Sequence, residues 1–230
     1  MKRKCIIVGL CVLLAALLTL YTGNFLHDAR PAARIYAAME QKRVYLTFDD
    51  GPTDSTTPKI LDILKREKVK ATFFLIGRQA ERRKETVKRE VSEGHSIGIH
   101  SYSHEYHKIY ASPEALLKDV EKCRKVIYDI TGNSPDLYRF PGGSFFLSES
   151  YVSAVKQAGY RYYDWNASCR DSELKNATAE ELYRSVVSTS AEKNSVILLC
   201  HDYAHNKAVV EILPRVITYF RESGYVFATL

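Results

Sequence analysis

Two short polar segments, about fifty residues apart, hold side chains of the types that hydrolytic metal sites use. The first, TFDDGP, contributes Asp49 and Asp50, and the second, HSYSH, contributes His100 and His104. A catalytic zinc ion commonly has three protein ligands and an open position for water. Two carboxylates and two imidazoles can provide three ligands and leave one carboxylate as a general base. Together these residues indicate metal-assisted hydrolysis, whereas either segment alone also fits a surface turn or a pair of exposed histidines.

Three further polar segments follow apolar runs later in the chain. Arg139 begins RFPGG, where an arginine can hold a carboxylate and the glycines Gly142 and Gly143 let a ligand approach the backbone. Asp164 stands in YYDW, and His201 follows LLC, where a histidine is suited to general acid catalysis near neutral pH. Each segment alone fits an ordinary loop or core residue, so the indication comes from their combination.

Apolar runs alternate with amphipathic helical patterns from Arg43 onward. Ser112 before Pro113 predicts a helix N-cap, and Thr178 with Glu181 has the spacing of a capping box. The expected strands cover residues 43–48, 71–76, 96–100, 137–140, 160–165, 195–200 and 225–229. The expected helices cover residues 57–68, 78–92, 113–130, 149–157, 179–192 and 207–222.

This alternation predicts an α/β fold with a mainly parallel sheet covered by helices. About seven strand–helix repeats favour a (β/α) barrel over two separate domains. The polar residues Asp49, His100, Arg139, Asp164 and His201 all lie at the C-terminal ends of expected strands. In a (β/α) barrel those ends meet on one face, where catalytic sites form. We therefore expect these side chains to converge on one pocket.

Taken in order, the five segments resemble those of the polysaccharide deacetylase family, also called carbohydrate esterase family 4 or the NodB homology domain. The similarity covers about residues 43–230. The resemblance implies a distorted (β/α) barrel that removes N- or O-acetyl groups from polysaccharides with a divalent metal. It implies that Asp50, His100 and His104 bind the metal. Asp49 would then be the catalytic base.

The resemblance also implies roles for the remaining polar residues. His201 would protonate the departing amine as the catalytic acid. Arg139 would orient the base, and Asp164 would orient or tune the acid. Trp165 and Leu199 would shape the pocket for the acetyl group. A backbone N–H of the glycine-rich loop would help to hold the oxyanion.

Three features depart from the pattern of the family, of which Ile99, in place of an asparagine common before the first metal histidine, is minor. Gly142 and Gly143 stand where many members have an aromatic residue after the proline, which could open the groove and alter substrate choice. Cys200 stands where an aliphatic residue is usual, next to the expected acid. The metal-binding Asp50 is retained, so we expect a metal-dependent enzyme. Zn²⁺ is the first expectation from Asp-His-His ligation, with Co²⁺, Ni²⁺ or Mn²⁺ as alternatives.

The composition suits an ordinary globular protein and excludes several classes. Apolar residues make up 46% of the chain and charged residues 26%, which argues against a disordered protein. The formal net charge is +6, and Lys2, Arg3 and Lys4 carry three of these charges. The small, dispersed charge of the remainder does not indicate a nucleic-acid binder. Nothing in the sequence indicates an oligomeric state.

The N-terminus carries the clearest targeting signal. Three basic residues precede an uncharged run of 22 residues, and about 20 apolar residues cross a bilayer as a helix. The basic flank should remain in the cytoplasm and direct the rest outside. We therefore expect a membrane anchor over residues 1–27, a linker over 28–42 and an extracytoplasmic catalytic domain over 43–230. A cleaved signal peptide is the alternative, although YTGN at residues 21–24 offers no strong cleavage site.

The five cysteines do not form a recognisable metal or disulfide framework. Cys5 and Cys11 lie in the expected anchor, and Cys123, Cys169 and Cys200 lie in the expected domain. Cys169 and Cys200 could pair if their segments adjoin. Buried free thiols are the preferred interpretation.

The combined expectation is a membrane-anchored, metal-dependent deacetylase that acts on peptidoglycan N-acetylglucosamine or N-acetylmuramic acid. One alternative keeps the fold and acts as a deacetylase or esterase on chitin, xylan or an exopolysaccharide. The other is a non-catalytic glycan-binding protein with the same fold. The complete set of base, acid and ligand residues argues against this last alternative.

Overall fold

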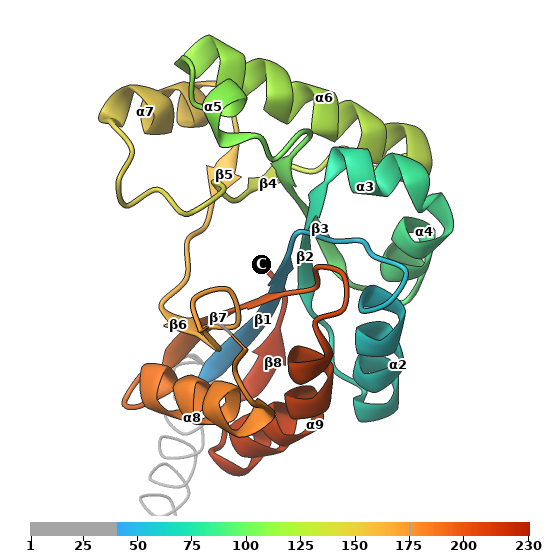
Figure 1. The fold of residues 1–230 in the computed structure, drawn as a ribbon, viewed down its shortest axis with the longest axis vertical. Coiled ribbons are helices and arrows are strands. Elements are labelled where there is room, and N and C mark those ends of the chain that lie inside the picture. The colour runs from blue at the N-terminus through green and yellow to red at the C-terminus, as the bar shows by residue number, and fades with distance from the viewer. Residues whose placement is uncertain (1–40, 175) are drawn as a thin grey trace, which may run out of the picture. The chain divides into compact units, whose positions relative to one another are not determined.

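Eight strands form one parallel sheet in the computed structural model, which describes residues 41–174 and 176–230 (Figure 1). Their order along the sheet is β5-β4-β3-β2-β1-β7-β6, and β8 pairs with the first half of β1. In chain order the strands are β1 (Arg43–Asp49), β2 (Thr72–Ile76), β3 (Ser96–Ser101), β4 (Leu137–Tyr138), β5 (Arg161–Tyr162), β6 (Ala167–Ser168), β7 (Ser195–His201) and β8 (Val226–Ala228).

The outer strands β5 and β6 are joined only by residues 163–166. A chain extends at most about 3.6 Å per residue, so this link reaches no further than about 18 Å. Seven strands at a spacing of about 4.8 Å would make a flat sheet about 29 Å wide. The sheet must therefore curl until its outer strands approach each other, and this curled parallel sheet fits the predicted distorted (β/α) barrel.

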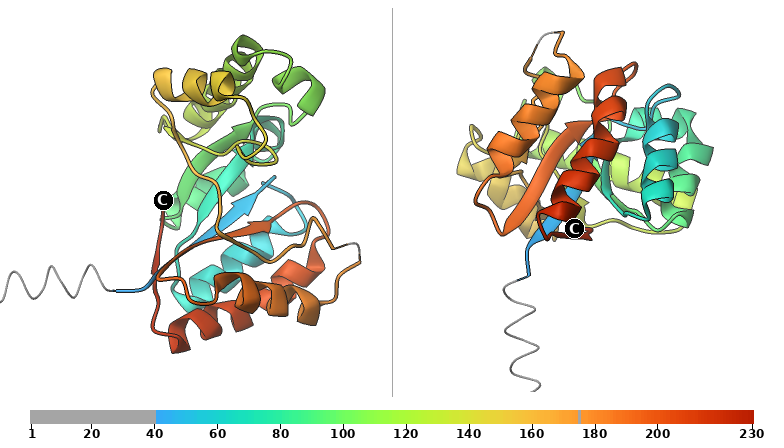
Figure 2. Two further views of the ribbon diagram at one scale, coloured as in Figure 1. Left: turned by 90° about the vertical axis from the view of Figure 1, so that its left-hand side faces the viewer. Right: turned by 90° about the horizontal axis from the view of Figure 1, so that it is seen from below.

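Helices lie on the outer side of the curled sheet (Figures 1 and 2). Their apolar faces pack on the strands and bury one continuous core. The helices are α2 (Thr57–Glu67), α3 (Gly77–Arg82), α4 (Lys84–Ser92), α5 (Tyr106–Ile109), α6 (Pro113–Thr131), α7 (Glu149–Gln157), α8 (Ala179–Ser190) and α9 (Lys207–Glu222).

The central strand β1 shows how the sheet positions a site. Successive side chains of a strand point to opposite faces. Val44, Leu46 and Phe48 therefore share one face and are buried in the apolar core. Thr47 and Asp49 share the other face and are buried polar residues. A buried polar pair at the C-terminal end of the strand requires polar partners, which the site described below provides.

Most predicted elements are confirmed, and the differences are few. Ser112 caps α6, and Thr178 with Glu181 forms the predicted capping box of α8. The predicted helix 78–92 is divided into α3 and α4 at Arg83, whose backbone leaves the helical region and whose side chain pairs with Asp54 at 2.8 Å. The short elements α5 and β6 were not predicted, because four or two residues carry no readable periodicity.

The expected membrane anchor at residues 1–27 lies outside the described residues, as does nearly all of the expected linker. Within the described residues, which form a unit from Lys42 to Leu230, no helix is both long and apolar enough to cross a membrane.

Candidate active site

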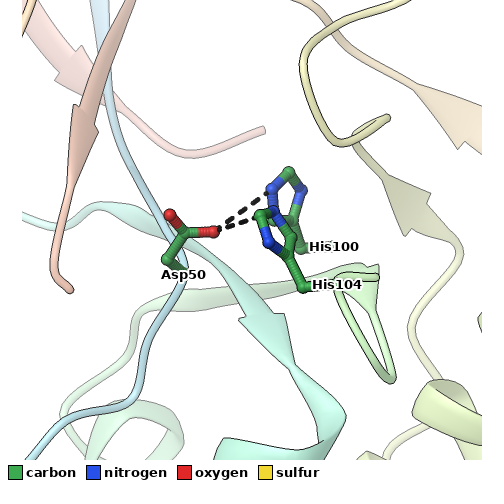
Figure 3. Close-up of side chains that lie close together, drawn as sticks. All are labelled: Asp50, His100 and His104. Carbon is green, nitrogen blue, oxygen red and sulfur yellow. Dashed lines mark ion pairs between the residues drawn. The ribbon is translucent and has the colours of Figure 1, made fainter. Parts of the chain in front are cut away.

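Asp50, His100 and His104 point toward one another from the ends of β1 and β3 (Figure 3). Asp50 Oδ1 lies 3.5 Å from Nε2 of His100 and 3.3 Å from Nε2 of His104. One ligand atom from each residue lies within 4.8 Å of the other two. Asp50 Oδ1 is buried and has no hydrogen-bond partner among the described residues. A cation bound between the three atoms would satisfy this oxygen, and a carboxylate with two imidazoles suits a divalent metal such as zinc.

A tight turn brings Asp50 to this position. Its backbone has φ 78°, in the left-handed region that aspartate tolerates better than most residues. The next residue must be glycine, since a Cβ on Gly51 would lie 2.1 Å from Oδ2 of Asp202. Asp202 is fully buried and accepts a hydrogen bond from Thr57 Oγ1 at 2.5 Å. The TFDDGP turn is therefore packed against a fixed carboxyl group at the end of β7.

The turn between His100 and His104 is held by Asp119 of α6. Its Oδ2 accepts hydrogen bonds from the Tyr102 N–H and the Ser101 hydroxyl, both at 2.6 Å. Its Oδ1 accepts from the Ser103 N–H at 3.1 Å and from the Ser103 hydroxyl at 2.7 Å. The N–H of His104 in turn donates to Ser101 Oγ at 2.8 Å. One carboxylate thus fixes the turn that places His104 beside His100.

His100 is held in the form that can bind a metal. Its Nδ1 donates to the carbonyl oxygen of Arg139 at 2.9 Å, which leaves the Nε2 lone pair facing Asp50. Burial lowers the pKa of His100 to about 3, against the attraction of Asp50. The imidazole is therefore neutral at physiological pH, as ligation requires.

Asp49 is the other carboxylate of the TFDDGP turn and lies beside the cluster of Asp50, His100 and His104. Its Oδ1 accepts a hydrogen bond from Arg139 Nη1 at 2.9 Å, and its Oδ2 lies 4.0 Å from Nε2 of His100. Arg139 is fully buried and also donates to Thr47 Oγ1 at 2.7 Å and to the carbonyl oxygen of Tyr163 at 2.9 Å. Burial raises the pKa of Asp49 although Arg139 opposes the shift. One oxygen is thus fixed by Arg139, while the other faces the metal centre.

The predicted role of Asp164 is wrong, because the carboxylate beside His201 belongs to Asp171. Nδ1 of His201 donates to Asp171 Oδ1 at 2.8 Å. Asp171 Oδ2 accepts from the His201 N–H at 3.0 Å and from Asn206 Nδ2 at 2.7 Å. Asp164 instead accepts hydrogen bonds from the N–H and the hydroxyl of Ser144 and holds the glycine-rich loop.

The strand order explains this correction. Asp164 follows β5 at one edge of the sheet, whereas Asp171 follows β6, which pairs with the β7 strand of His201. β6 is only Ala167–Ser168, and a strand of two residues carries no periodic pattern that could reveal it. The usable signal was the short small-residue run ASC before Arg170-Asp171.

Asp171 changes the charge state of His201. Burial alone would lower the pKa of His201, but the hydrogen bond and the charge of Asp171 raise it to about 9, with further attraction from Asp49 and Asp50. Burial likewise opposes ionisation of Asp171, yet its hydrogen bond with His201 holds its pKa below the usual value. His201 is therefore protonated at neutral pH, as a general acid must be.

The glycine-rich loop lies between aromatic rings. Gly143 has φ 83°, and a Cβ there would lie 3.0 Å from the ring of Trp165, so glycine is required. The N–H of Gly143 donates to the carbonyl oxygen of Phe140 at 2.8 Å and is not available to an oxyanion. Of the two glycines, only Gly142 therefore has an N–H that could donate to the oxyanion. Leu199 is buried in β7 beside Thr47, and its contact with an acetyl group stays a prediction.

The three cysteines of the described residues, Cys123, Cys169 and Cys200, are buried free thiols, as preferred from the sequence. The backbone N–H of Cys169 donates to the carbonyl oxygen of Leu199 at 3.1 Å, so Cys169 and Cys200 lie on adjoining strands without a disulfide.

Comparison with known proteins agrees with this arrangement. The polysaccharide deacetylase family model matches residues 37–163. A peptidoglycan-N-acetylglucosamine deacetylase of Bacillus cereus is 36% identical over 193 residues, which are 82% of this chain and 69% of that protein. The peptidoglycan-N-acetylmuramic acid deacetylase PdaA of Bacillus subtilis is 30% identical over 191 residues, covering 83% of this chain and 71% of the relative.

A solved structure gives the same result for the fold. The structure of a Streptococcus mutans CE4 esterase superposes with a TM-score of 0.78 at 31% identity and covers 86% of this chain and 90% of that one. Sequence, fold and relatives agree, and the chain belongs to the polysaccharide deacetylase family, whose members are hydrolytic enzymes that generally depend on a metal.

Proposed function

We propose that this protein removes acetyl groups from N-acetylglucosamine or N-acetylmuramic acid in peptidoglycan, with Zn²⁺ held by Asp50, His100 and His104. The observation that carries the proposal is that Asp49 and the His201–Asp171 pair lie near the cluster of Asp50, His100 and His104, which could hold a metal. The two relatives named above support peptidoglycan as the substrate, since each is named for an acetylated sugar of that polymer.

A zinc ion in this position would polarise the acetyl carbonyl and make water a stronger nucleophile at neutral pH. The work of the chain's own residues begins with Asp49. Its Oδ2 faces the centre and would take a proton from the attacking water. Arg139 keeps the carboxylate in place and compensates its charge through the bond to Oδ1.

His201 would complete the reaction as the acid. Its Nδ1 is committed to Asp171, so the proton on Nε2 is the one available to the leaving amine. Transfer of that proton to the amide nitrogen allows the C–N bond to break and acetate and the free amine to separate. Asp171 keeps the imidazolium oriented and stabilised until the transfer occurs.

A deacetylase or esterase acting on chitin, xylan or an exopolysaccharide is the second candidate. The superposition on a CE4 esterase favours keeping it, because the same centre can cleave an ester as well as an amide. Purified peptidoglycan, N-acetylglucosamine oligomers and acetylated xylan, compared as substrates, would rank the two candidates by the rate of acetate release.

The test of the proposal is acetate release from peptidoglycan by the full chain, with chelator and then with Zn²⁺ added back. We expect release that chelator abolishes and metal restores, and that Asp49→Asn prevents with the metal still bound. Release that persists after complete metal removal would overturn the metal-dependent mechanism. Metal-loaded, folded protein that releases acetate only from another polysaccharide would transfer the proposal to that substrate.

We also propose that the enzyme works outside the cell membrane, anchored by its N-terminal segment. The support is the sequence pattern of three basic residues before the 22-residue uncharged run. Cell fractionation of the full chain and of a chain lacking residues 1–27 tests this. The full chain should be found with membranes and be open to added protease, and an equal cytoplasmic distribution of both chains would contradict the proposal.

A further inference from the structure

The loop after β4 exposes two adjacent phenylalanines beside the site. Phe145 is 61% exposed and Phe146 is 95% exposed. Exposed apolar side chains that adjoin a polar site often mark where a ligand binds. The loop itself is held in place, because Ser144 bonds to Asp164 and the Leu147 N–H donates to Ser144 O at 3.1 Å. The two rings are thus presented by an ordered segment.

Phe145 is connected to the catalytic base through ring contacts, whereas Phe146 makes no ring contact in the described chain. The ring of Phe145 lies 5.6 Å from that of Trp165 at an interplanar angle of 82°. The ring of Trp165 lies 5.9 Å from the guanidinium of Arg139, which holds Asp49. Phe145 is therefore linked to Asp49 through only two intervening side chains.

A second aromatic ring borders the other side of the glycine-rich loop. Tyr106 is 48% exposed, and its ring packs edge-on against the metal ligand His104 at 5.4 Å. A Cβ on Gly142 would lie 3.3 Å from Tyr106, and a Cβ on Gly143 would lie 2.9 Å from Phe145. The two glycines thus let the backbone pass between two aromatic surfaces without covering either.

We propose that Phe145 and Trp165 form a platform that binds the sugar next to the one being deacetylated. The inference rests on the proposed function, since a polymer places a further sugar beside each acetylated one. A pyranose presents C–H groups on one face and hydroxyls at its rim, so an exposed aromatic face that borders polar groups suits it. The ring of Phe145 would then contribute binding energy to an oligomer that a single sugar does not receive.

Phe146 provides the matched control for this inference. It is the neighbouring residue, of the same type and more exposed, but it lacks the contact with Trp165. If the patch bound a lipid surface or a second copy of the chain, the more exposed Phe146 would contribute at least as much as Phe145. If it binds a sugar beside the site, Phe145 should dominate.

The experiment measures binding of an N-acetylglucosamine tetrasaccharide by calorimetry to zinc-loaded full chain that carries Asp49→Asn, so that the glycan is not consumed. Adding Phe145→Ala should weaken binding about tenfold, Phe145→Tyr should retain it, and Phe146→Ala should stay within about twofold. Trp165 is the only tryptophan, so binding should also shift the protein's tryptophan fluorescence in the Asp49→Asn protein.

The inference is overturned if Phe146→Ala weakens binding as much as Phe145→Ala, or if Phe145→Ala has no effect. Self-association that Phe146→Ala abolishes, measured by sedimentation, would assign the patch to contacts between copies instead. Phe145-dependent glycan binding by a wild-type chain that releases no acetate would retain the platform and refute the proposed function. Acetate release from peptidoglycan that is insensitive to Phe145→Ala would retain the proposed function and refute the platform.

Discussion

His100 and His201 stand in the same site, yet their surroundings move their pKa values in opposite directions. Burial lowers the pKa of His100 to about 3. Burial acts in the same sense on His201, but Asp171 reverses it and raises the pKa to about 9. The acceptor at Nδ1 is a backbone carbonyl for His100 and a carboxylate for His201. Because burial lowers the pKa of both rings, the charge of that acceptor accounts for the difference, and His100 stays neutral while His201 stays protonated at neutral pH.

The two halves of the site are therefore specialised before any substrate arrives. One half, built on β1, β3 and the residue after β4, holds the neutral imidazole of His100, the two carboxylates of Asp49 and Asp50, and the buried Arg139. The half built on β6 and β7 holds an imidazolium with its carboxylate. A reaction that needs a base and an acid at the same pH requires one unprotonated and one protonated group. Surroundings that push the pKa values of the two groups apart provide both.

The largest effect is expected from Asp49→Asn, which removes the base and keeps the shape of the side chain. We expect kcat for acetate release to fall by about 10³-fold, since general base catalysis contributes about 10² to 10⁴-fold. Zinc affinity, measured by calorimetry, should change little because Asp50 and the two histidines remain. Near wild-type turnover in this variant would remove Asp49 from the mechanism.

Asp171→Asn should have the next largest effect and should act on the acid half alone. The pKa of His201 is raised by Asp171, so the acid form persists until the pH rises through about 9. Without the carboxylate charge, burial lowers that pKa, and the falling limb of the pH–rate profile should move to lower pH. We expect kcat at neutral pH to drop about 100-fold. An unmoved limb would show that His201 is not the titrating acid.

Asp119→Asn should weaken the metal half without touching a ligand. Its carboxylate fixes the turn that carries His104, so we expect zinc affinity to fall about 10-fold or more. Asp129→Asn is the control, because Asp129 lies on the same helix and pairs only with Lys125 at the surface. Competition with a metal-binding dye measures both variants, and equal affinities would contradict the role of Asp119.

Asp164→Asn should have the smallest effect of the four changes. Its carboxylate bonds to Ser144 rather than to His201, so the high-pH limb of the profile should stay in place. We expect at most a few-fold loss of kcat/KM from a looser glycine-rich loop. A shift of the limb as large as that of Asp171→Asn would restore the role first predicted for Asp164.

The sequence predicted the metal half of the site better than the acid half. Asp50 follows β1, and His100 and His104 lie at or just after the end of β3. Both strands have readable apolar patterns, so the meeting of these residues at one end of the sheet could be inferred. Asp171 follows β6, a strand of only two residues. That β6 pairs with β7, the strand of His201, is seen only in the structure. Sheet order depends on long-range packing, which one sequence without its structure does not display.

The same limit applies to the helices and the loop after β4. The cap residues Ser112 and Thr178 act within one turn and were predicted correctly. The break at Arg83 coincides with an ion pair to Asp54, and the role proposed for Phe145 rests on its contact with Trp165. Both are tertiary contacts, so neither could be read from local spacing.

The most direct test of the divided site is an NMR titration of the imidazole nitrogens between about pH 5 and about pH 10, with His100→Gln and His201→Gln for assignment. We expect the His201 ring to stay protonated until about pH 9, and the His100 ring to stay neutral, with its proton on Nδ1, over the whole range. Titration of both rings together near the ordinary histidine pKa of about 6.5 would contradict the account.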